Sequence, residues 1–153
     1  MSILLLAFLF QATTEPSLRP LSELQKSALP ALCTKTTMFN GKGVSCYRAE
    51  WQPWLKEEAR RIAPAPAQKL MASGGALEDA AEEYLLLPGG QSFVVWATID
   101  KFSDSKIYWL ADWKGKSLNG VFQTKQGPAY FGKQSELLKR FNLGPWLLEN
   151  AAQ

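Results

Sequence analysis

The order of apolar and polar side chains changes character at residue 91. From there to residue 124 the two kinds alternate with a period of two, which is typical of β-strands. Three strands of an antiparallel meander are therefore predicted, at Ser92 to Asp100, Lys106 to Lys114 and Lys116 to Thr124. Before residue 91, apolar side chains recur mostly every three or four residues, which predicts helices.

Helices are predicted where this longer period is bounded by proline or glycine. Leu21 to Leu29 forms the first and stops at Pro30, and Pro53 stands at the first position of the second. Another runs from Ala76 to Leu87, where a Pro-Gly-Gly run ends it, and Ser135 is placed to cap a C-terminal helix. The predicted fold class is α+β: a three-stranded antiparallel meander plus an N-terminal β-hairpin, packed with four or five helices.

The loops between the strands set the register of the meander. A turn at residues 114–115 places Trp109 opposite Gly120, where the ring would cover the strand glycine. A loop closed by residues 100 and 106 places Ala97 opposite Trp109. Both registers gather one set of side chains on a single face, the predicted core: Phe93, Val95, Ala97, Ile99, Ile107, Trp109, Ala111, Trp113, Leu118 and Phe122.

The opposite face of the meander is too apolar for a surface that meets only water. It carries Val94, Trp96, Thr98, Tyr108, Leu110 and Val121 beside Asp112, Asn119 and Gln123. Two interpretations follow: the hairpin or a helix covers this face, or part of it is an exposed binding surface. In the second case, Trp96 and Tyr108 are the expected binding residues.

The two cysteines, Cys33 and Cys46, flank a segment that predicts a hairpin with a glycine-containing turn. A two-residue turn at Asn40–Gly41 leaves Cys46 one diagonal step from Cys33, whereas a four-residue loop, Met38 to Gly41, places them directly opposite each other. The longer loop is the prediction if the protein is exported, and a disulfide there would stabilise the fold by about 3 kcal/mol. No metal site is predicted, because only carboxylates could complete the ligand set.

An unbroken apolar run at Ile3 to Phe10 precedes an abrupt change to polar sequence. The run is too short to span a bilayer, but it suits the core of a secretory signal, with small residues at Ala12 and Thr14 where a peptidase cuts. A signal or apolar N-terminal segment is predicted over residues 1–14, followed by a single domain over residues 15–153, in a periplasmic or secreted protein. The alternative is a cytoplasmic protein in which the run is a buried strand or helix.

Composition narrows the classes of function. The 153 residues include no His, so a Ser-His-Asp triad, a Cys-His dyad and an imidazole zinc site are excluded. With 12% aromatic residues and a net charge of +3, the chain has enough apolar surface to collapse, which excludes a disordered protein. Paired carboxylates remain available for hydrolysis, and the candidates are Glu50, Asp100, Asp104 and Asp112.

Two short motifs imitate known sites. Gly127 to Gln134 nearly matches the phosphate loop G-x-x-x-x-G-K-[ST], but Gln134 replaces the hydroxyl that binds magnesium, and the preceding strands are antiparallel. No nucleotide or other cofactor is therefore predicted, although the amides before the Ser135 helix, next to Lys133, could hold an anion. Ser103 to Lys106 spells S-x-x-K, but it lies in a predicted loop, which does not hold Ser and Lys one helical turn apart.

Positive charge is concentrated in the C-terminal part of the chain. Residues 114–140 carry six basic side chains against one acidic side chain, Glu136. An acidic protein or an anionic envelope polymer is the expected partner, and nucleic acid is less expected for an exported chain. The predicted function is a small, exported, non-enzymatic binding or inhibitor/immunity-like domain. The alternatives are a carboxylate-dependent hydrolase of an envelope polymer and a cytoplasmic nucleic-acid-binding domain. The predicted binding residues are Trp96, Tyr108, Lys114, Lys116, Lys125 and Lys133.

Overall fold

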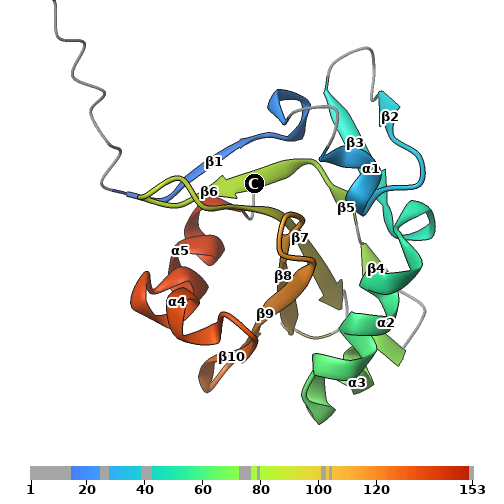
Figure 1. The fold of residues 1–153 in the computed structure, drawn as a ribbon. Helices are drawn as coiled ribbons and strands as arrows, with labels where there is room; N and C mark the ends of the chain where they lie inside the picture. The colour runs from blue at the N-terminus through green and yellow to red at the C-terminus, as the bar shows by residue number, and fades with distance from the viewer. Residues whose placement is uncertain are drawn as a thin grey trace, which may run out of the picture.

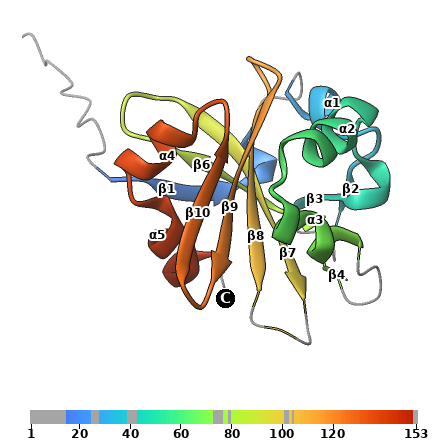
Figure 2. The same cartoon turned by 90° about the horizontal axis from the view of Figure 1, so that it is seen from below.

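Residues 15–24, 28–38, 43–72, 77–78, 80–100, 103 and 105–151 are described by the computed structural model of the chain. They form three layers, with a large antiparallel sheet in the middle (Figure 1). A small sheet and helices from the N-terminal half lie against one side of it, and helices from the C-terminal end lie against the other (Figure 2).

In the described part of the chain, seven strands form the large sheet: β1 (Ser17–Pro20), β4 (Leu77–Glu78), β6 (Glu83–Leu86), β7 (Ser92–Asp100), β8 (Lys106–Asp112), β9 (Ser117–Thr124) and β10 (Gly127–Gly132). Their order is β1-β6-β7-β8-β9-β10, and β4 pairs with β7 beyond the end of β6. The predicted arrangement of a three-stranded meander packed with helices is therefore wrong. The meander β7-β8-β9 is the centre of a larger sheet, which β6 and β1 extend on one side and β10 on the other.

The predicted helix at residues 76–87 is a set of strands. β4, β5 (Ala80–Ala81) and β6 follow one another there, and β6 pairs with β7 on one edge and with β1 on the other. Tyr84 and Leu85 are both buried, and they belong to the cores on opposite faces of the sheet. A strand covered on both faces has a nearly continuous apolar run, which sequence periodicity does not distinguish from a buried helix.

Five α-helices and two 3₁₀ turns are present among the described residues: η1 (Leu21–Glu23), α1 (Leu29–Leu32), η2 (Arg48–Glu50), α2 (Pro53–Ile62), α3 (Ala65–Ala72), α4 (Ser135–Arg140) and α5 (Leu143–Asn150). The predicted start at Pro53 is confirmed. The predicted helix over residues 21–29 is wrong, because η1 ends at Glu23 and the backbone of Leu24 is extended. Pro30 does not stop a helix there; it lies in the first turn of α1, where proline is tolerated. None of the helices described is long and apolar enough to cross a membrane.

The small sheet consists of β2 (Thr37–Met38), β3 (Val44–Tyr47) and β5. Thr37 lies opposite Ser45, which matches neither predicted hairpin register; the predicted turn itself lies outside the described residues. The predicted disulfide is confirmed, with 5.9 Å between the Cα atoms of Cys33 and Cys46. Cys33 directly follows α1 instead of lying in a hairpin strand, so the bond joins a helix end to β3.

The predicted register of the meander is confirmed at its second turn and wrong at its first. Trp109 lies opposite Gly120, as predicted, but Trp96 and not Ala97 lies opposite Trp109. Because side chains alternate between the faces of a sheet, this shift of one residue moves every β7 side chain to the other face. Trp96 consequently stacks on Trp109, with 6.2 Å between the ring centroids.

Both faces of the large sheet are covered, but by different parts of the chain. On the first face, Trp96 and Trp109 pack in a core with α1, α2, α3 and the disulfide. On the second face, Val95 and Tyr108 pack in a core with buried leucines of α4 and α5. The apolar outer face predicted for the meander is therefore divided between two cores, and α5 ends at Asn150, beside the second of them.

Candidate functional site

Trp96 and Tyr108, two of the predicted binding residues, are buried. Trp96 is 3% exposed and Tyr108 is 1% exposed, and they lie in the cores on opposite faces of the sheet. The one-residue shift in register separates them, and the packed helices cover them. They do not form the common exposed face that the alternation of side chains predicted.

Three of the four predicted lysines lie close together in the fold. Lys114 and Lys116 lie in the turn between β8 and β9, and Lys133 directly follows β10. Because the end of β10 pairs with the start of β9, these three exposed lysines share one end of the sheet, which we call the basic end. Lys125 lies in the turn between β9 and β10, at the opposite end.

A network of polar side chains holds the basic end together. The N–H groups of Lys114 and Gly115 donate to Asp112 Oδ1 at 3.1 and 3.0 Å. Asn119 Nδ2 donates to Gln134 Oε1 at 2.9 Å, and the Gln134 N–H donates to Asn119 Oδ1 at 2.7 Å. Gln134 Nε2 lies 3.5 Å from Asp112 Oδ2. The residues that imitate a phosphate loop therefore join β9 to α4, and Asp112 is the acceptor of a tight turn.

The predicted carboxylates are not brought together beside Asp112. Asp100 ends β7 and Asp112 ends β8, so they lie at opposite ends of an antiparallel hairpin. Glu50 lies in η2, and Asp104 lies outside the described residues. The Ser103 Oγ hydroxyl donates to Asp100 Oδ2 at 2.8 Å, so the serine of the S-x-x-K motif has a role within the loop.

A bulge interrupts the pairing along one edge of β7. β4 and β6 both pair with β7, but the chain between Glu78 and Glu83 is one residue longer than the stretch of β7 between their partners, Ile99 and Val95. Within the bulge, Ala80 and Ala81 pair with β3 instead. A bulge breaks the regular alternation of side chains between faces. Here both Glu82 and Glu83, which are neighbours in the sequence, border the same cavity.

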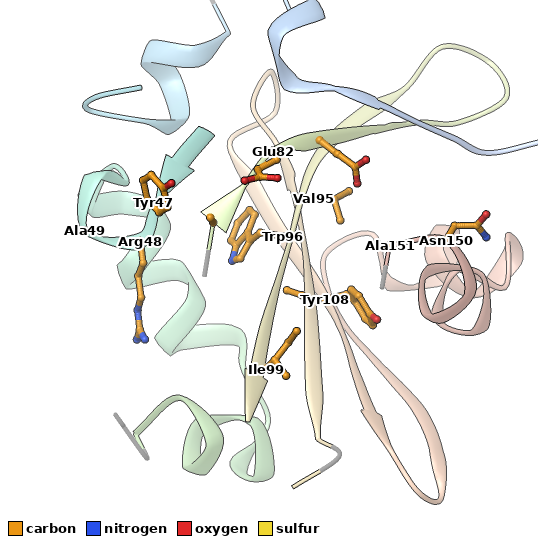
Figure 3. Close-up of a pocket in the computed structure, with 13 residues that line it drawn as sticks. Tyr47, Arg48, Ala49, Glu82, Val95, Trp96, Ile99, Tyr108, Asn150 and Ala151 are labelled. Carbon is orange, nitrogen blue, oxygen red and sulfur yellow. The ribbon is translucent and has the colours of Figure 1, made fainter. Parts of the chain in front are cut away.

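This cavity is an open groove of about 860 Å³ beside β7 (Figure 3). Arg48 and Trp96 lie on one side of β7 in this view, and Ile99 and Tyr108 lie on the other. Tyr47 stands at the edge and is 39% exposed. The groove is lined by side chains from β3 and η2, from the bulge, from β7 and β8, and from the end of α5: Tyr47, Arg48, Ala49, Ala80, Glu82, Glu83, Val95, Trp96, Ala97, Ile99, Tyr108, Asn150 and Ala151.

Two glutamates determine the charge of the groove. Removal from water raises the pKa of the Glu83 carboxyl, and the neighbouring charge of Glu82 raises that pKa further. Burial raises the pKa of the Tyr108 hydroxyl. Neither glutamate is paired with a basic side chain of the described residues. Arg48, which also borders the groove, already has a partner within the chain.

Trp96 carries an indole N–H without a hydrogen-bond partner among the described residues, although its ring packs against Trp51 and Trp109. Its neighbours are satisfied: Trp109 Nε1 donates to Thr98 Oγ1 at 2.9 Å, and Trp51 Nε1 donates to the Cys46 carbonyl at 3.1 Å. The Trp51 ring meets Trp96 edge-on, with 4.1 Å between centroids. A buried donor without an acceptor costs stability, and a ligand that accepts from it removes that cost.

Sequence reasoning missed the two glutamates and Tyr47. The helix predicted over residues 76–87 placed Glu82 and Glu83 on its solvated side, where charged residues need no explanation. One signal was available, because two adjacent acidic residues come directly before the apolar run 84–87. In a regular strand, adjacent side chains point to opposite faces, so two adjacent side chains that face the same cavity require a bulge.

Within the part of the chain that the structure describes, no group of three or more cysteine, aspartate or glutamate side chains is arranged to hold a metal ion. Comparison of the chain with protein-family models, with curated proteins and with solved structures finds no match.

Proposed function

We propose that the chain is a small exported binding domain that holds a segment of a partner protein in the groove beside β7. The observation that carries the proposal is the groove itself, about 860 Å³ in volume, with apolar and aromatic side chains along it and two glutamates at its edge. Ligand sites in proteins are typically concave and carry a few placed polar groups that orient the ligand. Tyr47 supports the proposal, because exposed aromatic side chains commonly anchor a partner.

The disulfide supports export. Structural disulfides persist mainly in oxidising compartments outside the cytoplasm. The bond between Cys33 and Cys46 lies next to the groove, because Cys46 directly precedes Tyr47 and Arg48 in the chain. It therefore holds one edge of the groove against the helix end that carries Cys33.

The positions of the carboxylates favour binding over hydrolysis. Glu82 and Glu83 are consecutive residues, so they approach the groove from the same edge. Glycosidases place their two carboxylates on opposite sides of the bond that breaks. The chain also contains no His that could act as a general base. The predicted carboxylate-dependent hydrolase is therefore the less supported alternative.

A peptide selection tests the proposal. Random peptides of about ten residues, the length of typical extended ligands, would be selected on the oxidised wild-type protein and then measured on Tyr47→Ala. Peptides that occupy the groove should bind Tyr47→Ala about tenfold more weakly or worse, because an aromatic anchor is lost. They should bind Lys125→Ala, changed in the distant β9–β10 turn, as they bind the wild type. If no selected peptide depends on Tyr47 or on other groove residues, the proposal is wrong.

The basic end favours a second candidate function, the binding of an acidic protein or an anionic envelope polymer. Lys114, Lys116 and Lys133 present three positive charges on one rigid end of the sheet. A polyglutamate column tests this candidate by the salt concentration at which the protein elutes. The triple alanine variant of these lysines should elute at lower salt than the wild type, and Lys125→Ala should not. Equal elution of the triple variant and the wild type would reject the candidate.

A further inference from the structure

We infer that the segment held in the groove is an extended, positively charged peptide, with one Lys or Arg side chain that reaches Glu82 and Glu83. This inference rests on the proposed function and names the chemistry of the partner. Charge, shape and an unused hydrogen-bond donor each support it.

The carboxylates of the groove favour a positively charged ligand. Among the described residues, two carboxylates border the groove, and the guanidinium of Arg48, which also borders it, already has a partner within the chain. The raised pKa of Glu83 indicates that its charge is held close to a like charge and partly away from water. An ammonium or guanidinium group offsets both unfavourable effects, since it pairs with the carboxylates through charge-assisted hydrogen bonds. An acidic peptide or a nucleic-acid strand would add to the repulsion.

The shape of the groove suits a long basic side chain. Lys and Arg bury their methylene stems along apolar surface while the charged head stays at a polar position. Val95, which lies opposite Glu83, and Ala97 supply such a surface along the groove. The Tyr47 ring at the edge can contact a cation through its face. A compact cation without a stem would leave these apolar residues uncovered.

An extended backbone suits a groove that is lined from β3 to the end of α5. On this side of β7, β5 packs against the strand and pairs with β3, so the peptide is expected to lie in the groove and not to add a strand to the sheet. Trp96, which borders the groove, has an indole N–H without an acceptor among the described residues. A peptide supplies one carbonyl acceptor per residue, so the same ligand can provide both the cation and the missing acceptor.

The peptide selection, repeated on Glu82→Gln/Glu83→Gln, tests the inference. Gln keeps the shape of Glu and removes its charge, so the groove remains while the carboxylates are lost. Peptides that depend on Tyr47 should be enriched several-fold in Lys or Arg at one position on the wild type, and this enrichment should disappear on the double variant. Glu57→Gln, an exposed change on α2, is the matched control and should keep the enrichment.

Two synthetic peptides measure how much the basic side chain contributes to affinity. A selected peptide and the same peptide with norleucine in place of the basic residue would be compared by calorimetry on the wild type. The basic peptide should bind about tenfold more tightly, and the difference should fall below about twofold on Glu82→Gln/Glu83→Gln, as expected for the loss of a charge-assisted hydrogen bond.

The two proposals fail in different ways. Tyr47-dependent peptides without a preference for Lys or Arg would overturn the inference and leave the proposed function standing. A preference that is unchanged on Glu82→Gln/Glu83→Gln would also overturn the inference alone. A selection that yields no groove-dependent peptide at all would overturn both.

Discussion

The basic end and the groove differ in whether their polar groups have partners within the fold. At the basic end, Asn119 and Gln134 exchange two hydrogen bonds, and Asp112 accepts from the turn beside it. At the groove, the indole N–H of Trp96 has no partner among the described residues, and the exposed Glu83 has a carboxyl that is partly desolvated and close to the charge of Glu82. Polar groups that satisfy one another hold the fold, whereas those left without partners mark a place that a ligand can complete.

The residues that resemble known sequence motifs are not the residues that line the candidate binding site. The near phosphate loop and Asp112 attract attention in the sequence, yet the structure uses both to join β8, β9 and α4. Glu82 and Glu83 match no motif, and a bulge makes them part of a groove. Local backbone geometry, more than residue type, therefore decides which polar residues become available to a partner.

Loss of the disulfide should have the largest effect, and it should act on the groove side. Cys33→Ala/Cys46→Ala should lower the free energy of unfolding by about 3 kcal/mol on the chain-entropy estimate, measured by guanidinium denaturation. The variant should also bind groove peptides more weakly, because β3 carries Tyr47 and Arg48 follows it. Hydrogen exchange in β8 and β9 at low denaturant is the control and should stay slow. A variant as stable as the wild type would contradict the account.

Asn119→Ala should destabilise the basic end and leave the groove unchanged. Asn119 is 0% exposed, and its loss removes the partner of the Gln134 N–H and one of two donors to the Gln134 side-chain oxygen. The expected cost is about 2 kcal/mol in urea denaturation. Gln126→Ala, in the exposed β9–β10 turn, should cost less than about 0.5 kcal/mol. Weaker binding of groove peptides by Asn119→Ala at a temperature where it is fully folded would show that the two regions are not independent.

Two tryptophan substitutions should differ by about 1 kcal/mol, the typical net value of one hydrogen bond. Trp109→Phe removes the donor to Thr98, whereas Trp96→Phe removes an N–H that has no partner in the described part of the chain. Both remove a similar ring volume from the same stack, so the lost packing largely cancels in the difference. Trp109→Phe should therefore be the less stable variant in guanidinium denaturation. Equal stabilities, or the reverse order, would mean that the Trp96 N–H is satisfied in solution.

Glu83→Gln should have the smallest effect, and the effect should depend on pH. The raised pKa means that the folded protein holds the Glu83 proton more tightly than the unfolded chain does. Stability contributed by this group is therefore lost as pH rises from its ordinary value of 4.5 through the raised value. Glu83→Gln should gain stability relative to the wild type across that window and keep the gain at neutral pH.

Urea denaturation at several pH values measures this difference. The other titratable groups along the groove, those of Glu82, Arg48, Tyr47 and Tyr108, are unchanged in the variant. Glu57→Gln, on the solvated face of α2, is the control and should give a curve parallel to the wild type. If Glu83→Gln also gives a parallel curve, the carboxyl is not perturbed in the folded protein.

The part of the fold that sequence predicted correctly has strict alternation and a tight turn. β8 and β9 form with Trp109 opposite Gly120 because the short turn between them allows little choice of register. The longer loop before β8 allowed a shift of one residue, which exchanged the faces of β7. The helix predicted over residues 76–87 failed because pairing with strands on both edges outweighs local periodicity.

Only part of the candidate site could be predicted from the sequence. Trp96 and Tyr108 do border the groove, but they are buried on opposite faces instead of sharing an exposed one. The disulfide was predictable from two cysteines, whereas its place at the edge of a groove was not, because Cys33 pairs from a helix end. The two glutamates depend on a bulge, which follows from pairing between distant segments, and the adjacent acidic pair before residues 84–87 was a weak local signal of it.

A chemical-shift map with the smallest suitable cation tests directly whether the groove binds a basic side chain. N-acetyl-lysine methylamide would be titrated into the ¹⁵N-labelled oxidised protein, with the norleucine analogue as the uncharged control. We expect shifts that saturate at residues 47–49, 80–83 and 95–99 with the lysine probe, and smaller shifts at the same residues with the analogue. Shifts that are equal for the two probes, or that cluster at the basic end around residues 114–117, would contradict this expectation.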